Sequence, residues 1–148
     1  MSHFTLSRRS FVLGTAATLA LPSISIAKTF GDNGIALNGT DPVAYFTQSQ
    51  PVQGSVDFST DWNGATWYFS SSETLNMFSE NPEKYAPQYG GHCAYAVSKG
   101  YLASTDPEAW TIHDDKLYLN YSKLVRTLWA RDIPANVIKA DTNWPTLK

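Results

Sequence analysis

The stretch SVDFSTDWNGATWYFS, residues 55–70, carries the clearest structural signal in the chain. Two segments in which apolar and polar residues alternate, 55–60 and 65–70, are separated by the tetrapeptide DWNG. Asn-Gly between alternating segments is the strongest short-range signal for a β-hairpin, because both residues tolerate the positive φ that a tight turn requires. The stretch therefore predicts an antiparallel hairpin with Trp67 and Phe69 on one face of its second strand.

A second hairpin is expected in the segment AWTIHDDKLYLNY. Its strands are 110–113 and 117–120, joined by a turn at residues 114–116. Helices are expected where apolar residues recur three or four positions apart, or where a capping residue stands before a proline. These helices are a turn within residues 38–46 with Asp41 as N-cap, a helix capped by Ser72, a short helix from Pro82, a helix from Ser122 and a last helix capped by Asp132, before Trp144-Pro145 closes the chain.

The segment HCAYAVSKG, residues 92–100, is compatible with two structures. Its alanines and the terminal Gly100 favour a helix that ends in a left-handed cap. The alternation of Cys93, Tyr95 and Val97 with alanines also allows a strand, and the helix is preferred.

Together these elements predict an α+β fold with a small antiparallel sheet. About four strands in two hairpins form the sheet, most simply a single four-stranded one, and several short helices cover it. Because no period of 20 to 50 residues repeats, residues 35–148 are interpreted as one domain.

The first 27 residues have the pattern of a twin-arginine export signal. The pair Arg8-Arg9 precedes an apolar run from Phe11 to Leu21, which is shorter than the roughly 18 residues that a membrane-spanning helix needs. The pattern therefore predicts passage through the twin-arginine export machinery to the periplasm.

Small residues at Ser25 and Ala27 predict that signal peptidase cuts after Ala27. The mature chain would then begin at Lys28, with residues 28–34 as a flexible lead-in and with no stable membrane anchor.

Composition argues against nucleic acid as a partner. The chain has 11 Lys and Arg against 13 Asp and Glu, and removal of Arg8 and Arg9 with the signal makes the balance more acidic. Binding to phosphates requires a basic face, and no cluster of Lys or Arg occurs after the signal.

Three stretches resemble the exported YHS domain proteins of bacteria: GTDPVAYF (39–46), YFSSSETLNMFSENPEKYAPQYGGHCAYAVSKG (68–100), and the tail from DPEAWTIHDDKLYLNYSKLV to NWP. YHS domains are similar to the TRASH group of small treble-clef-like modules, several of which bind or sense heavy metals such as copper through spaced cysteines. The resemblance therefore implies a binding protein with a thiophilic metal ion, copper first, as its ligand.

The sequence departs from that pattern because Cys93 is its single cysteine, whereas a tetrahedral thiolate site needs several. His92, His113 and Met77 are the candidates to complete a site anchored by Cys93. Adjacent side chains diverge, so His92 and Cys93 reach one ion only from an irregular backbone, which Gly90-Gly91 can supply. The alternatives are a buried, apolar role for Cys93 or a redox role.

Aromatic residues support a different reading of the same chain. Tyr89, Tyr95 and Tyr101 surround the glycine pair and are candidates for a ligand pocket, while Trp67, Trp110 and Trp129 are assigned to the core. The protein would then be a metal-free module that binds a small ligand or a protein through its aromatic residues. No catalytic constellation is present in the sequence, so an enzyme is not expected.

Overall fold

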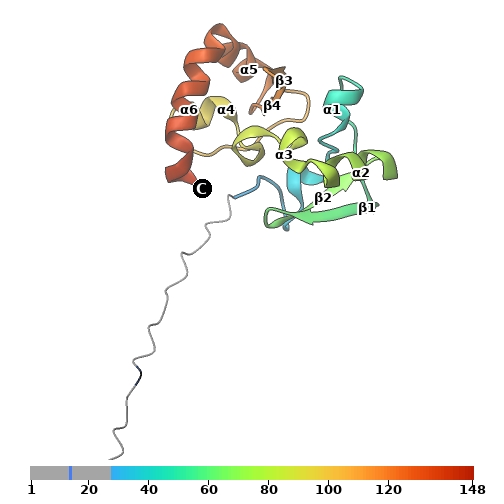
Figure 1. Ribbon diagram of the computed structural model, residues 1–148. Coiled ribbons are helices and arrows are strands. Elements are labelled where there is room, and N and C mark those ends of the chain that lie inside the picture. The colour runs from blue at the N-terminus through green and yellow to red at the C-terminus, as the bar shows by residue number, and fades with distance from the viewer. Residues whose placement is uncertain (1–13, 15–27) are drawn as a thin grey trace, which may run out of the picture.

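The computed structural model describes Gly14 and residues 28–148, so the expected export signal lies outside the described residues apart from Gly14. Figure 1 shows two groups of elements, one around the β1–β2 hairpin (green) and one around the β3–β4 hairpin (orange), which is accompanied by the long helix α6. Within the described part of the chain, no helix has both the length and the apolar character needed to cross a membrane.

The first hairpin is formed by β1 (Ser55–Trp62) and β2 (Ala65–Phe69). Asn63 and Gly64 have φ of 51° and 79°, the positive values that the Asn-Gly signal predicted for a two-residue turn. This prediction is confirmed, and β1 extends two residues further toward the turn than expected.

The second hairpin is formed by β3 (Trp110–His113) and β4 (Lys116–Leu119). Its turn residues Asp114 and Asp115 also have positive φ, of 50° and 60°. The α+β class, the two hairpins and the four strands are confirmed. The strands form two separate two-stranded sheets, however, and not one sheet of four. An isolated hairpin has little stability in water, so each depends on the helices packed against it.

The helical elements of the first group are η1 (Ala36–Gly39), α1 (Ala44–Thr47), α2 (Ser72–Glu80) and α3 (Pro82–Tyr85). Two expected caps differ in position. The N-cap of α2 is Ser71, whose Oγ accepts the Thr74 N–H at 3.2 Å, one residue before the expected Ser72. The N-cap of α1 is Val43 and not the expected Asp41. The side chain of Asp41 has other partners, which are described below.

The helical elements of the second group are η2 (Gln88–Gly91), α4 (Ala94–Ser98), α5 (Lys123–Trp129), η3 (Ala130–Asp132) and α6 (Ile133–Leu147). The preference for helix at α4 is confirmed, with Gly100 left-handed at φ 92°. Asp132 caps α6 as predicted by accepting the Ala135 N–H. The helix continues through Trp144 and Pro145, which lie near the end of the chain as expected.

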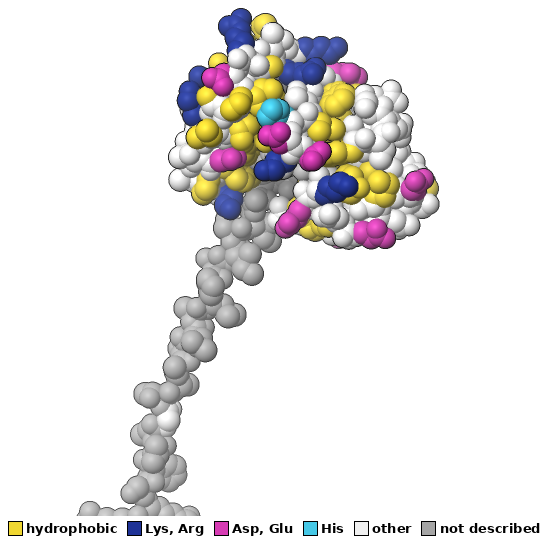
Figure 2. All heavy atoms as spheres, turned by 45° about the horizontal axis from the view of Figure 1, so that its top comes forward, with side chains coloured by type: hydrophobic (Ala, Val, Ile, Leu, Met, Phe, Trp, Pro, Cys, Tyr) yellow, Lys and Arg dark blue, Asp and Glu magenta, His cyan; other side chains and the backbone are white. Residues whose placement is uncertain are grey.

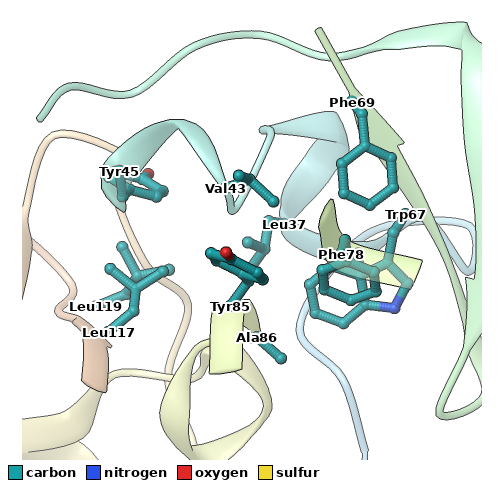
Figure 3. Close-up of a cluster of buried hydrophobic side chains, with 11 residues drawn as sticks. Leu37, Val43, Tyr45, Trp67, Phe69, Phe78, Tyr85, Ala86, Leu117 and Leu119 are labelled. Carbon is teal, nitrogen blue, oxygen red and sulfur yellow. The ribbon is translucent and has the colours of Figure 1, made fainter. Parts of the chain in front are cut away.

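Two clusters of buried side chains form the core, one for each group. The first contains Trp67, Phe69 and Phe78, and it also takes in Leu117 and Leu119 from β4, which lie beside Tyr45 in Figure 3. The second consists of Tyr89, Ala94, Val97, Tyr118, Trp129 and Ala140. Alternate residues of β4 therefore face different clusters, which joins the two groups. Trp67 and Trp129 are buried as expected, whereas Trp110 is only partly buried.

The segment of residues 28–34 lies against both groups. The Phe30 N–H donates to the Gly90 carbonyl at 2.8 Å, and the Phe30 carbonyl accepts the Leu37 N–H at 2.8 Å. The expected lead-in thus has specific backbone bonds to the start of each group.

Candidate functional site

Cys93 immediately precedes α4, and only 1% of its surface is exposed to solvent. Its Sγ accepts the backbone N–H of Tyr121 at 3.2 Å and lies 3.5 Å from Asn120 Oδ1, to which the thiol donates. The same Asn120 oxygen accepts the Tyr95 N–H at 3.0 Å. The sulfur is therefore enclosed by groups that hydrogen-bond to it and to the start of α4.

His92 points away from this cluster, toward the N-terminal segment. Its Nε2 lies 3.2 Å from the Lys28 carbonyl oxygen, and its ring packs against Phe30 and Trp144 at centroid distances of 5.9 and 6.1 Å. Burial lowers the pKa of His92, although backbone carbonyls of Lys28 and Ala103 favour the protonated ring.

His113 and Met77 belong to other parts of the molecule. His113 ends β3 and pairs at 3.3 Å with the exposed carboxylate of Asp114, while Met77 lies in α2 and packs against the first core cluster. Among the residues that the structure describes, no three or more His, Cys, Asp or Glu side chains are grouped so that they could hold a metal ion.

A pocket of about 230 Å³ lies where the two groups of elements meet, and we call it the seam pocket. The first group contributes Trp62, Trp67 and Glu83, the second contributes Tyr89 and Trp144, and Thr29 of the N-terminal segment completes the wall. Ligand sites often occur at such junctions, because two surfaces there leave a concave space that neither forms alone.

Neighbouring rings hold the aromatic walls in place. Trp62 lies edge-on to Phe78 at 5.6 Å and beside Trp67 at 5.8 Å. On the other side, Trp144 packs edge-on against Tyr89 at 6.0 Å. Because each indole has a buried aromatic neighbour, the walls are pre-formed.

Tyr89 links this wall to α6 through its hydroxyl, which donates to Asp141 Oδ1 at 2.8 Å. Burial, followed by this hydrogen bond, raises the pKa of Tyr89 well above its usual range, so the hydroxyl stays protonated and keeps donating.

Two polar groups of the pocket lack partners. Glu83, in the first turn of α3, forms no salt bridge with any described residue. Thr29 Oγ1 is buried and has no hydrogen-bond partner among the residues described. A ligand with a cationic part against the indoles would bring its charge close to the Glu83 carboxylate.

The sequence identified one of these residues, Tyr89. Tyr95 and Tyr101 do not line the seam pocket: the Lys99 ammonium lies 5.0 Å from the centroid of the Tyr95 ring, and Tyr101 is 55% exposed. Trp62 and Trp144 were missed because nothing in the sequence places the end of β1 opposite the end of α6. The only signals in the sequence were that Trp62 stands beside the Asn-Gly turn and that Trp144 stands beside a proline.

Residues 43–89 match the family model of the YHS domain, from the N-cap of α1 to the second residue of η2. No curated protein and no solved structure matches the chain.

Proposed function

We propose that this protein is an exported binding protein, not an enzyme, and that it holds a small organic cation in the seam pocket. The observation that carries the proposal is the convergence of Trp62 and Trp144 with the unpaired carboxylate of Glu83 on one cavity. Export to the periplasm is supported by the sequence pattern of the first 27 residues.

The size of the cavity limits the ligand. A volume of about 230 Å³ is that of roughly seven or eight water molecules, at about 30 Å³ of liquid for each. A ligand of about that many non-hydrogen atoms, such as a short alkylammonium or choline, suits the space.

Charge and aromatic surface favour a cation over an anion. Residues 28–88 hold two lysines against seven Asp and Glu, and one of those lysines, Lys84, has its ammonium over the Tyr85 ring at 5.2 Å. On the face that Figure 2 shows, several Lys and Arg side chains lie along the top, and the lower right carries mainly acidic ones. A cation against an indole face is stabilised by about 0.5–2 kcal/mol, and a carboxylate beside it adds to this attraction.

Copper binding anchored by Cys93 is also supported, by the resemblance to YHS domain proteins. Its further ligands would have to come from His92, His113 or Met77, which lie on different elements and contact other groups. No contact in the described residues favours it, so the seam pocket carries the proposal.

The proposal is tested by following ¹⁵N-labelled protein during titration with choline and with its neutral isostere 3,3-dimethyl-1-butanol. We expect choline to shift the indole N–H signals of Trp62 and Trp144 in a saturable way, and the alcohol to bind much more weakly. The Trp110 signal, outside the pocket, is the internal control. Equal binding of both compounds would reject the cation class and keep the pocket, whereas no shift with either would reject the pocket.

A further inference from the structure

We infer that residues 89–148 contain a second, diverged copy of the unit formed by residues 37–88. Both begin with a left-handed turn and continue through a short helix, a hairpin, a serine-capped helix and a helix with proline in its first turn. Equivalent residues are 52 positions apart before the hairpins and 51 positions apart after the hairpin turns. The inference is independent of the ligand proposed above.

The opening turns agree in unusual detail. Leu37–Gly39 have φ of 53°, 50° and 87°, and Tyr89–Gly91 have φ of 57°, 61° and 84°. A non-glycine residue with a large side chain seldom adopts positive φ, so three consecutive left-handed residues that begin with Leu or Tyr are uncommon. In each copy the next residue closes the turn: the Thr40 N–H donates to Leu37 O at 3.1 Å, and the His92 N–H to Tyr89 O at 3.0 Å.

The segments after the hairpins agree as well. Ser71 and Ser122, 51 positions apart, each cap a helix. The hydroxyl oxygen of each serine accepts the backbone N–H of the residue three positions later, Thr74 or Val125. Ten residues after each cap stand Asn81 and Asp132, with φ and ψ of −149° and 72° in the first copy and −151° and 76° in the second. Both residues precede the helix with proline in its first turn.

The packing between hairpin and helix also repeats. Trp67 on β2 and Phe78 on α2 have ring centroids 5.1 Å apart. Their equivalents at a shift of 51, Tyr118 on β4 and Trp129 on α5, are 5.2 Å apart. Each pair belongs to the core cluster of its own copy.

In the first copy, the buried carboxylate of Asp41 ties the turn to the hairpin exit. Its Oδ2 accepts the N–H of Ser70 at 2.9 Å and the hydroxyls of Ser70 and Thr74 at 2.8 Å. Its Oδ1 accepts the Val43 N–H at the start of α1, at 2.9 Å.

In the second copy, Cys93 occupies the position of Asp41. The Tyr121 N–H, equivalent to that of Ser70, donates to Cys93 Sγ. The Tyr95 N–H, equivalent to that of Val43, donates to Asn120 Oδ1 in place of a second carboxylate oxygen. Cys93 and Asn120 therefore together accept the two backbone hydrogen bonds that Asp41 accepts alone in the first copy. Cys93 thereby positions the start of α4 against the residues that follow β4.

Asn120 takes the place that Phe69 fills in the first copy, where Phe69 packs on Phe78 at 5.0 Å. In the second copy, Asn120 Nδ2 and Trp129 Nε1 are buried without hydrogen-bond partners among the described residues. Because Asn120 occupies a position that an aromatic ring fills in the first copy, its Nδ2 finds no acceptor there. Its Oδ1 supplies the second acceptor, since a thiol has one sulfur where a carboxylate has two oxygens.

Urea unfolding of variants that rebuild the first copy's arrangement in the second tests the inference. Cys93→Asp alone should unfold at lower urea than wild type, because a buried carboxylate then faces the Asn120 oxygen. Cys93→Asp combined with Asn120→Phe and Val125→Thr, which restore the equivalents of Phe69 and Thr74, should unfold at higher urea than Cys93→Asp alone. The last two changes without Cys93→Asp form the matched control and should destabilise.

If the combined variant is no more stable than Cys93→Asp alone, the equivalence of Cys93 and Asp41 is overturned. Amide hydrogen exchange of the wild-type protein keeps the test decisive if the variants do not fold. The N–H groups of Tyr95 and Tyr121 should be protected to the same degree as those of Val43 and Ser70, and rapid exchange at the first pair with slow exchange at the second would contradict the inference.

Discussion

The sulfur of Cys93 accepts a hydrogen bond from the backbone N–H of Tyr121, with 3.2 Å between the two atoms. The bond joins the start of α4 to the residue that follows β4 by two positions, and it buries the thiol. A cysteine held in this way serves the fold as an acceptor, and its sulfur is not presented to solvent.

Replacement of Cys93 should therefore affect stability according to what the new side chain accepts. Cys93→Ala leaves the Tyr121 N–H without its partner and should lower the free energy of unfolding by about 1–3 kcal/mol. Cys93→Ser keeps an acceptor and should cost less. Urea unfolding of the two variants measures the difference, and equal losses would show that the hydrogen bond to the sulfur is unimportant.

Copper uptake separates this structural role from a metal site. The reduced protein is titrated with Cu(I) in competition with a chromophoric chelator, alongside Cys93→Ser. We expect the two proteins to take up Cu(I) equally weakly. Tight uptake by the wild type that Cys93→Ser abolishes would establish Cys93 as a ligand.

Asp41 should be among the most sensitive positions of the first copy. Asp41→Ala removes the acceptor of two backbone N–H groups and two hydroxyls in a fully buried place, and we expect a loss of at least about 3 kcal/mol. The control is Asp57→Ala on β1, whose side chain is exposed and whose loss should change stability by about 0.5 kcal/mol or less. Similar effects of both changes would contradict the assigned network.

His92 predicts how stability depends on pH. Its pKa is lowered by burial in the fold, below the ordinary value of about 6.5 expected when unfolded, so the unfolded chain binds more protons between the two values. The contribution of His92 to the free energy of unfolding should thus reach its maximum above about pH 6.5 and should decrease as the pH drops below that value. The positive charge of Lys28 also opposes protonation of His92, whereas the Lys28 carbonyl favours it.

His92→Phe, which keeps a ring against Phe30 and Trp144, should flatten this part of the pH profile. His113→Gln, which alters the histidine at the end of β3, is the control and should leave the slope due to His92 in place. A slope that survives His92→Phe unchanged would assign the titration to another group.

Local signals in the sequence predicted the hairpins well because the turn residues themselves determine the geometry. Asn63-Gly64 accepts positive φ readily, and Asp132 caps its helix through its own carboxylate. Separation of the strands into two sheets was not predictable in this way, because it depends on which buried faces meet.

The internal duplication could not be predicted from the sequence for a similar reason. Its period of 51 to 52 residues is slightly longer than the 20 to 50 residues typical of repeat proteins, and the equivalent positions share few identities, among them Gly39 with Gly91 and Ser71 with Ser122. What the copies share is backbone conformation, which different residues achieve: Asn81 and Asp132 adopt nearly the same φ and ψ. The seam pocket could not be predicted either, since its walls come from residues as distant as Trp62 and Trp144.

Isothermal titration calorimetry with choline, on the wild type and on Glu83→Gln, tests the central claim most directly. Glu83 lies at the surface, so its replacement leaves the fold intact, and Glu73→Gln on α2 is the matched control because Glu73 does not line the pocket. The account predicts saturable binding by the wild type and the control, and affinity lower by about tenfold for Glu83→Gln, equivalent to about 1.4 kcal/mol. Absence of saturable binding by the wild type, or equal affinity in all three proteins, would contradict it.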